Sequence, residues 1–256
     1  MGVSMSLWYN TGTHWKEVSM ARNDARMKGI MVGSGPSLDK IDLNALTGTG
    51  KRVFGMNNAY PAIKPDVWLG MDLPIYHDGR VFDEPFIKIL RGSDGKELRD
   101  GRVISTIANV YYADVEEVDD SNELFLRRNH NTKFVWHGNT MATTLHVIVW
   151  MGHREIYIAG CDLDNSNRHH FQGHPVNHVT DEAILYDRQL YDQLFVYLEW
   201  FVRTAARNGI QVYSISPDSR INTIMHYVDL KDLNDEIQAS QQERDYLPRS
   251  NTFVEE

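Results

Sequence analysis

The sequence predicts an α/β fold, in which helices cover both faces of a mostly parallel β-sheet. Short apolar runs, rich in β-branched and aromatic residues, alternate with longer helical patterns along the chain. Strands that alternate with helices form parallel sheets that are buried on both faces. The 256 residues are 42% hydrophobic and 24% charged, which is enough for one substantial core.

Strands are expected where such runs are bounded by turn residues. They are Gly29–Gly33, Arg52–Met56, Val67–Met71, Arg102–Ser105, Lys133–Trp136, Glu155–Ala159 and Gln211–Ser214.

Three segments predict helices. Thr140–Met151 has apolar residues on most of its faces, which indicates a buried helix. Asp181–Asn208 is long and amphipathic, and the glycine at position 209 is a typical C-terminal stop. Leu230–Arg249 is polar with sparse apolar residues, which predicts a surface helix or an oligomer arm.

The composition excludes some functions. A net charge of -9 weighs against sequence-independent binding to duplex DNA, which needs a positive surface. Cys161 is the one cysteine of the sequence, so no intrachain disulfide can form. No apolar run approaches the roughly 18–20 residues of a membrane span, and no signal-peptide pattern precedes the first strand. A cytoplasmic location is therefore expected.

Ligands of parallel α/β sheets bind at the carboxyl ends of the strands, so the loops after the strands are the candidate site. In "GSGPS", Gly33 and Gly35 permit close backbone approach, and Pro36 presets a turn. Ser34 or Ser37 could cap the following helix, and free N–H groups there would favour a phosphate. The alternative is a plain strand-to-helix turn. The loop lacks the GxGxxG pattern of dinucleotide-binding proteins.

Amides and a helix start follow two other strands. Asn57 and Asn58 offer donors and acceptors that suit a nucleobase or ribose, although asparagine is also common in turns. In "HGNT", Gly138 permits close approach, and Asn139 or Thr140 can cap the helix that begins there. Its N-terminus could face a phosphate or a sugar carboxylate, or be a plain cap.

The loop "GCDLDNSNRHHFQGHPVNHVTDE" is the richest in functional groups. Asp162 and Asp164 form a DxD pattern, whose carboxylates suit Mg²⁺ or Mn²⁺ bridging to phosphates. Four histidines follow, at positions 169, 170, 174 and 178. They could provide a general base, bind a transition metal, or be solvated. Residues 163–182 form a connection that is long for a βα unit, and this length predicts a lid over the site.

Four ordered stretches, "MVGSGPSLDKID", "VFGMNNAY", "GNTMATTLHVIVWMGHREIYIAGCDL" and "GIQVYSISPDS", resemble the bacterial sialyltransferases of glycosyltransferase family 42. They also resemble the DUF115 group, which includes motility-accessory-factor-like glycosyltransferases and an archaeal 6-hydroxymethylpterin diphosphokinase. The resemblance runs in order from about residue 28 to 222 and implies one Rossmann-like domain with a nucleotide across the carboxyl edge of the sheet. We expect this domain to span residues 1–230, followed by a C-terminal surface helix and tail over 231–256.

The resemblance also implies site residues. A lid histidine would be the base that deprotonates the acceptor hydroxyl, either His174 or His178, and "QGH" favours His174. Asp162 matches an aspartate near the nucleotide and joins the catalytic set. The residues expected to bind the nucleotide or donor are Gly33, Ser34, Gly35, Pro36, Ser37, Asn57, Asn58, Asp72, Gly138, Asn139, Thr140, His170, Ser216, Pro217 and Ser219.

One departure from the family changes the expected donor. The sialyltransferases have two tyrosines after the aspartate, where this sequence has Asp164 and His170. A second carboxylate favours a diphosphate donor with Mg²⁺ or Mn²⁺ on Asp162 and Asp164 over a CMP-sialic acid donor.

The sequence thus predicts a nucleotide-sugar-dependent glycosyltransferase that acts on an acceptor hydroxyl of a glycan, protein, metabolite or modified base. A homo-oligomer is expected. The alternatives are a Mg²⁺-dependent pyrophosphokinase that uses ATP on a hydroxymethyl acceptor, and a non-catalytic nucleotide-binding protein.

Overall fold

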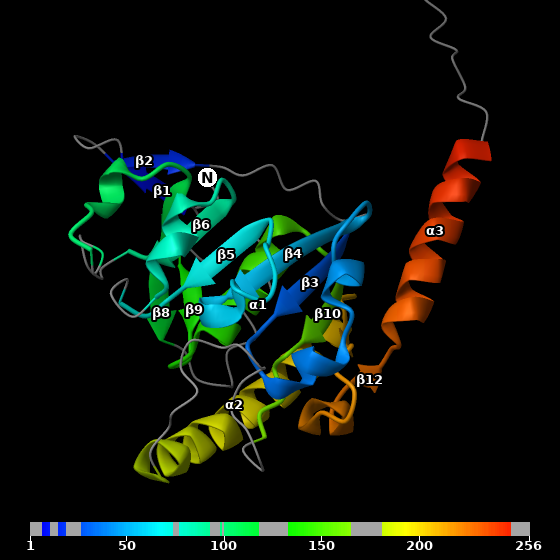
Figure 1. Ribbon diagram of the computed structural model, residues 1–256. Coiled ribbons are helices and arrows are strands. Elements are labelled where there is room, and N and C mark those ends of the chain that lie inside the picture. The colour runs from blue at the N-terminus through cyan, green and yellow to red at the C-terminus, as the bar shows by residue number, and fades with distance from the viewer. Residues whose placement is uncertain are drawn as a thin grey trace, which may run out of the picture.

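A computed structural model describes residues 7–10, 15–18, 27–73, 77–92, 98, 100–117, 133–164 and 181–246. Within these residues, a large twisted sheet runs through the centre of the molecule and helices pack against it (Figure 1). The order of its strands is β12-β11-β10-β3-β4-β5-β6-β7-β1-β2. All neighbours from β12 to β7 pair in parallel, whereas β1 and β2 form an antiparallel hairpin beside β7. The predicted α/β class is therefore confirmed.

The elements have the following bounds. The strands of the large sheet are β1 Leu7–Asn10, β2 Trp15–Val18, β3 Lys28–Val32, β4 Lys51–Met56, β5 Val67–Gly70, β6 Ile87–Arg91, β7 Val110–Ala113, β10 Glu155–Ala159, β11 Gln211–Ser214 and β12 His226–Tyr227. A separate pair consists of β8 Val115–Glu117 and β9 Phe134–Trp136. The α-helices are α1 Thr140–Met151, α2 Asp181–Arg207 and α3 Leu230–Tyr246. The 3-10 helices are η1 Pro36–Lys40, η2 Leu43–Leu46, η3 Asn57–Ala59, η5 Gly79–Asp83, η6 Ile104–Thr106 and η8 Arg220–Thr223.

The middle of the sheet has the strand order of a Rossmann fold. The six strands β5-β4-β3-β10-β11-β12 follow the 3-2-1-4-5-6 order when they are numbered along the chain. The order reverses between β3 and β10, which pair with Val32 opposite Ala159. The loops after these two strands therefore start side by side, at the point where ligands of such sheets bind.

Alternate residues of the central strands point into two different cores. Met31 and Phe54 face α1 and α2 on one side of the sheet. Ile30 and Val32 face the other side, where the cover is formed by η1, η2 and the first turns of α3. Both faces are covered as predicted, although 3-10 helices provide much of the second layer.

Helix α1 begins and ends where the sequence predicts. The Asn139 side chain accepts a hydrogen bond from the Met141 N–H at 2.7 Å and caps the helix. Gly152, in the left-handed conformation with φ 103°, ends it. Helices α2 and α3 also lie within their predicted ranges.

The sheet beyond β5 was predicted poorly. Arg102–Ser105 was expected as a strand, but Ile104 starts the 3-10 helix η6 and packs into a separate core cluster. The sheet positions after β5 belong instead to β6 and β7. Lys88 interrupts the apolar pattern of β6, yet it is fully buried, because its ammonium donates to the carbonyls of Glu84, Phe86 and Ala108.

None of the described helices combines the length and the apolar character that crossing a membrane requires.

Candidate functional site

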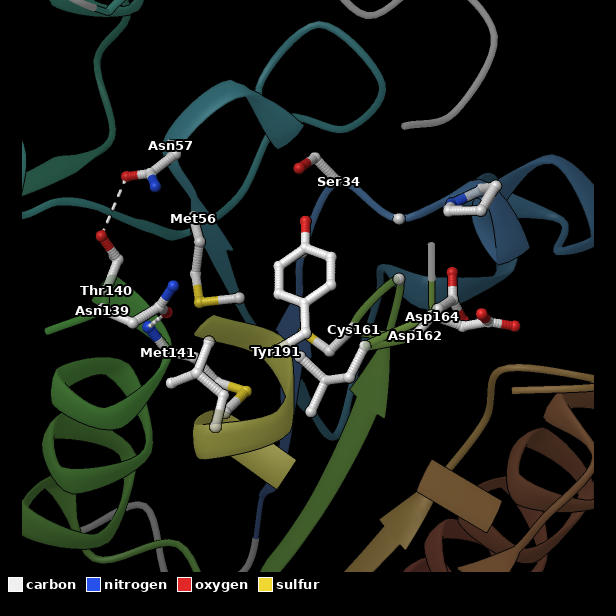
Figure 2. A pocket seen from close by; sticks show the side chains of 16 residues that line it. Ser34, Met56, Asn57, Asn139, Thr140, Met141, Cys161, Asp162, Asp164 and Tyr191 are labelled. Carbon is white, nitrogen blue, oxygen red and sulfur yellow. Dashed lines mark hydrogen bonds between the residues drawn. The ribbon is translucent and has the colours of Figure 1, made fainter. Parts of the chain in front are cut away.

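A pocket opens at the point where the strand order reverses (Figure 2). It encloses about 590 Å³ of empty space, part of which is open to solvent. The loops after β3, β4 and β10, the N-terminus of α1 and one face of α2 form its walls. The lining residues are Gly33, Ser34, Gly35, Pro36, Met56, Asn57, Asn139, Thr140, Met141, Gly160, Cys161, Asp162, Leu163, Asp164, Tyr191 and Leu194.

The loops after β3 and β10 are locked together by backbone contacts. Gly33 N–H donates to the Ala159 carbonyl at 2.8 Å, and Gly35 N–H donates to the Gly160 carbonyl at 2.7 Å. A Cβ atom on Gly33 would lie 2.4 Å from the Gly160 carbonyl oxygen, and one on Gly35 would lie 2.4 Å from Asp162 Oδ2. These two glycines are therefore required by the packing of one loop on the other.

The predicted caps of the helix after β3 are wrong. Gly35, and not a serine, is the N-cap residue of η1, and it makes no side-chain cap hydrogen bond. Asp162 Oδ2 instead accepts a hydrogen bond from the Ser37 N–H at 2.9 Å. The N–H groups of Gly33, Gly35, Ser37 and Leu38 all donate within the protein. The expectation that N–H groups of this loop are free for a phosphate is wrong at these four positions.

The two carboxylate oxygens of Asp162 differ in their contacts. The residue is 7% exposed, and its Oδ1 has no hydrogen-bond partner among the described residues. A buried carboxylate oxygen without a donor is costly, so a ligand that supplies a donor here gains affinity.

The charge of the pocket is negative in the described part of the chain. Asp162 and Asp164 are its two charged lining residues, and no described lysine, arginine or histidine lines it. Burial raises the pKa of the neighbouring Cys161 thiol, and the charge of Asp162 raises it further, so this thiol stays protonated at neutral pH.

Asn57 occupies the opposite wall in an uncommon backbone conformation. Its φ of 44° lies in the left-handed region, which asparagine tolerates better than most residues. The Trp68 Nε1–H donates to its backbone carbonyl at 2.8 Å, and the Thr140 hydroxyl donates to its Oδ1 at 3.1 Å (Figure 2). Because Oδ1 is held in this way, Nδ2 is the part of the carboxamide that remains for a ligand.

Leu163, between the two aspartates, is also left-handed, with φ 50°. Its backbone carbonyl accepts a hydrogen bond from Arg220 Nη1 at 3.3 Å. The same guanidinium donates to Asp192 of α2 at 2.6 Å and lies 4.3 Å from the centre of the Phe195 ring. Arg220 therefore ties the loop after β10 to α2.

Eight predicted site residues line the pocket. They are Gly33, Ser34, Gly35, Pro36, Asn57, Asn139, Thr140 and Asp162, and the predicted metal ligand Asp164 joins them. His170, His174 and His178 lie outside the described residues, so their roles stay predictions.

Seven other predicted binding residues do not line the pocket: Ser37, Asn58, Asp72, Gly138, Ser216, Pro217 and Ser219. Ser37 and Ser216 lie buried behind it, where the Ser37 hydroxyl donates to Ser216 Oγ at 3.0 Å and Ser216 Oγ accepts from the Gly160 N–H at 2.9 Å. Asp72 is exposed, and its negative charge affects the pKa of His77. Burial lowers the pKa of this histidine, and the charge of Asp72 opposes that shift.

Seven lining residues were not singled out from the sequence: Met56, Met141, Gly160, Cys161, Leu163, Tyr191 and Leu194. Met56 and Met141 directly adjoin predicted residues, so extending each loop by one residue would have found them. Tyr191 and Leu194 come from α2, and Figure 2 shows the Tyr191 hydroxyl directed toward Ser34. No local pattern marks this face of the helix as part of a site.

No protein-family model matches the chain, and no curated protein matches it either. Solved structures of a sialyltransferase are similar to it. The enzyme CstII from Campylobacter jejuni with the substrate analogue CMP-3FNeuAc has a TM-score of 0.45 and 12% identity over 79% of this chain and 86% of that chain. CstII with a trisaccharide acceptor and CMP has a TM-score of 0.44 and 14% identity over 79% and 86% of the two chains.

These values describe a general likeness in the course of the chain and assign no role to a residue. The solved structures to which this chain is similar thus include a sialyltransferase, the class that the sequence motifs resemble. The resemblance to the DUF115 group stays a prediction.

Proposed function

We propose that the protein is a glycosyltransferase that binds a nucleotide sugar and moves the sugar to an acceptor hydroxyl. One observation carries the proposal: a pocket at the switch point of a Rossmann-ordered sheet, walled by a glycine loop, Asn57 and the N-terminus of α1. Nucleotides bind at this place in sheets of this order.

The two ends of the pocket differ in chemistry, and this difference suggests how the donor lies. Asp162 Oδ1 needs a hydrogen-bond donor and would repel a phosphate placed beside it. The nucleoside part, whose ribose hydroxyls and base amino groups are donors, therefore lies at this end. The phosphate lies at the other end, near Asn57 Nδ2 and the first turn of α1, where helical N–H groups have no helical partner.

The proposed reaction is a displacement at the anomeric carbon of the donor sugar. The acceptor oxygen forms a bond to this carbon while the bond between the carbon and the phosphate oxygen breaks. The nucleotide leaves with the bonding electron pair. His174 or His178 takes the proton of the acceptor hydroxyl, as the family resemblance implies. His170 contacts the donor in the same proposal.

A divalent cation on Asp162 and Asp164 is the alternative arrangement, in which the donor phosphates would lie at the Asp162 end of the pocket instead. No group of three or more histidine, cysteine, aspartate or glutamate residues that could hold a metal occurs in the described ranges. Mg²⁺ in nucleotide sites is commonly held by one or two carboxylates together with substrate phosphates and water. The two aspartates fit this pattern only if Asp162 contributes its partnerless Oδ1, because Oδ2 accepts from Ser37.

Isothermal titration with UDP-, GDP-, ADP-, TDP- and CMP-sugars, with and without Mg²⁺ or EDTA, tests the proposal. We expect one nucleotide class to bind, and its sugar to be released slowly to water. Asn57→Ala should weaken that binding about 10- to 150-fold, because a hydrogen bond to the charged phosphate is lost. If none of the five classes binds or is hydrolysed, the proposal is wrong.

Two further results would redirect the assignment. Release of AMP from ATP with a hydroxymethyl acceptor would identify a pyrophosphokinase. Sugar transfer that is unchanged in a His174→Ala, His178→Ala double variant would remove both histidines as the base.

A further inference from the structure

Trp68 contacts Asn57 of the pocket wall without lining the pocket itself. Its side chain is fully buried in the middle of β5, within a core cluster separate from those of the two sheet faces. The indole ring makes edge-to-face contacts with His77, at 4.9 Å between ring centres, and with Phe82, at 5.8 Å. Its one polar atom, Nε1, donates to the backbone carbonyl of Asn57 at 2.8 Å.

This hydrogen bond falls on a residue whose backbone conformation needs support. Asn57 has φ 44°, and residues in sparsely populated backbone regions keep that conformation only when their surroundings hold them. Two contacts from other elements meet here: Trp68 of β5 holds the backbone carbonyl, and Thr140 of α1 holds the side-chain Oδ1. Together they fix the direction of the remaining carboxamide nitrogen, Nδ2.

Leu163, the other left-handed residue with a side chain among those that line the pocket, is held in the same manner. The backbone carbonyl of Leu163 accepts from Arg220, a side chain 57 residues away in the sequence. In both places a side-chain donor from another element binds the carbonyl of a strained loop residue. Strained residues clustered in a pocket indicate a role in function.

We propose that Trp68 is a positioning residue of the nucleotide site, which keeps Asn57 left-handed and thereby directs Asn57 Nδ2 into the pocket. The inference rests on the proposed function, because it assigns a ligand contact to Asn57. Trp68 itself touches no ligand. Without the indole N–H, the Asn57 peptide can rotate toward the commoner right-handed or extended conformations, and the carboxamide then moves away from its ligand.

A ligand-free measurement tests the first step. In Trp68→Phe, the ¹³Cα and ¹³Cβ chemical shifts of Asn57 should move away from left-handed values, because these shifts report φ and ψ. Trp68→Phe also makes the side chain smaller. In a second variant, benzothienylalanine replaces Trp68 by nonsense suppression, which keeps the size of the ring and removes only the N–H. Unchanged Asn57 shifts in both variants would overturn the inference, whether or not a nucleotide has been found.

A double-mutant cycle tests the second step, with whichever of UDP, GDP, ADP, TDP and CMP binds the unmodified protein most tightly. Trp68→Phe should weaken that binding about five- to tenfold, the usual effect of losing one hydrogen bond. In an Asn57→Gly background the same substitution should cost less than about twofold, because no carboxamide is left to position. An equal loss in both backgrounds would mean that Trp68 acts on general stability.

Phe82→Leu is the matched control, since Phe82 packs on the same indole ring but forms no hydrogen bond with Asn57. It should lower the unfolding temperature and leave nucleotide affinity unchanged. If no nucleotide binds the unmodified protein, the proposed function fails. If Asn57→Gly weakens binding while both Trp68 variants bind normally, the proposed function survives and the inference about Trp68 fails.

Discussion

The replacement Asp162→Asn gives the sharpest test of how the donor lies in the pocket. The substitution keeps the size of the side chain and removes its charge. Ser37 N–H needs an acceptor, and the amide oxygen of the new side chain can take the place of Oδ2 at 2.9 Å. The amide nitrogen then occupies the position of Oδ1, which faces no partner among the described residues. A hydrogen-bond acceptor in the pocket is thus exchanged for a donor.

The size of the effect follows from this exchange. A hydrogen bond to a charged group contributes about 1.5–3 kcal/mol, so its loss should weaken nucleotide binding about 10- to 150-fold at 25 °C. The unfolding temperature of the ligand-free protein should change little. The loop contact to Ser37 is kept, and a buried charge at 7% exposure is removed.

The assay is isothermal titration of both proteins with a series of nucleotides. The series contains the parent ribonucleotide, its 2′-deoxy and 3′-deoxy forms, and a form that lacks the amino group of the base. The loss of affinity caused by Asp162→Asn should vanish for the one analogue that lacks the hydrogen-bond donor to Asp162. The identity of that analogue shows whether the donor is a ribose hydroxyl or the amino group of the base. The reasoning would be refuted if Asp162→Asn weakened the binding of every ligand in the series equally, or left the affinity for the parent ribonucleotide unchanged. A loss that EDTA reproduces in the unmodified protein would instead make Asp162 a metal ligand.

Three further predictions concern packing and access. Gly35→Ala, whose Cβ would meet Asp162 Oδ2 at 2.4 Å, should destabilise the fold by about 1–3 kcal/mol and impair nucleotide binding. In the control Gly79→Ala the new Cβ meets its nearest atom at 3.5 Å, so neither stability nor binding should change. Thermal unfolding measures the change in stability, and isothermal titration measures the change in binding. Lys28→Met removes the ammonium that joins β3 to Glu236 of α3 at 2.9 Å and should speed hydrogen exchange in α3 first. Alkylation of the Cys161 thiol by iodoacetamide should be slower than that of glutathione, because burial raises its pKa, and bound nucleotide should slow it further.

The parts of the fold that were predictable are those in which the local pattern and the final environment agree. Helix α1 has apolar residues on most of its faces and carries its own cap and stop signals at Asn139 and Gly152, so its bounds can be read from the chain. Strand β6 could not be read in this way. Lys88 looks like an exposed residue, and only the three carbonyls around its ammonium allow it to be fully buried.

The candidate site was predictable to the extent that it follows the strand ends. The rule that parallel sheets bind ligands at their carboxyl edge selected the loops after β3, β4 and β10. The rule places a loop but does not say where its hydrogen bonds go. Ser34 or Ser37 was expected to cap the helix, but the Ser37 N–H instead donates to Asp162, a residue 125 positions away. Such long-range pairing leaves no trace in the local sequence.

The missing third glycine of the loop after β3 has a physical explanation in the same contacts. In dinucleotide-binding sheets that glycine allows the following helix to pack closely. Here Leu38 stands at that position, 1% exposed, and its side chain fills the core on the α3 side of the sheet. The close approach is still present, but the glycine that permits it belongs to the partner loop. A Cβ atom on Gly160 would lie 2.7 Å from Leu38 Cγ, and Gly160 has φ 64°. The loops after β3 and β10 therefore pack closely against each other at the switch point. Their glycines are required by this packing, whether or not a ligand is bound.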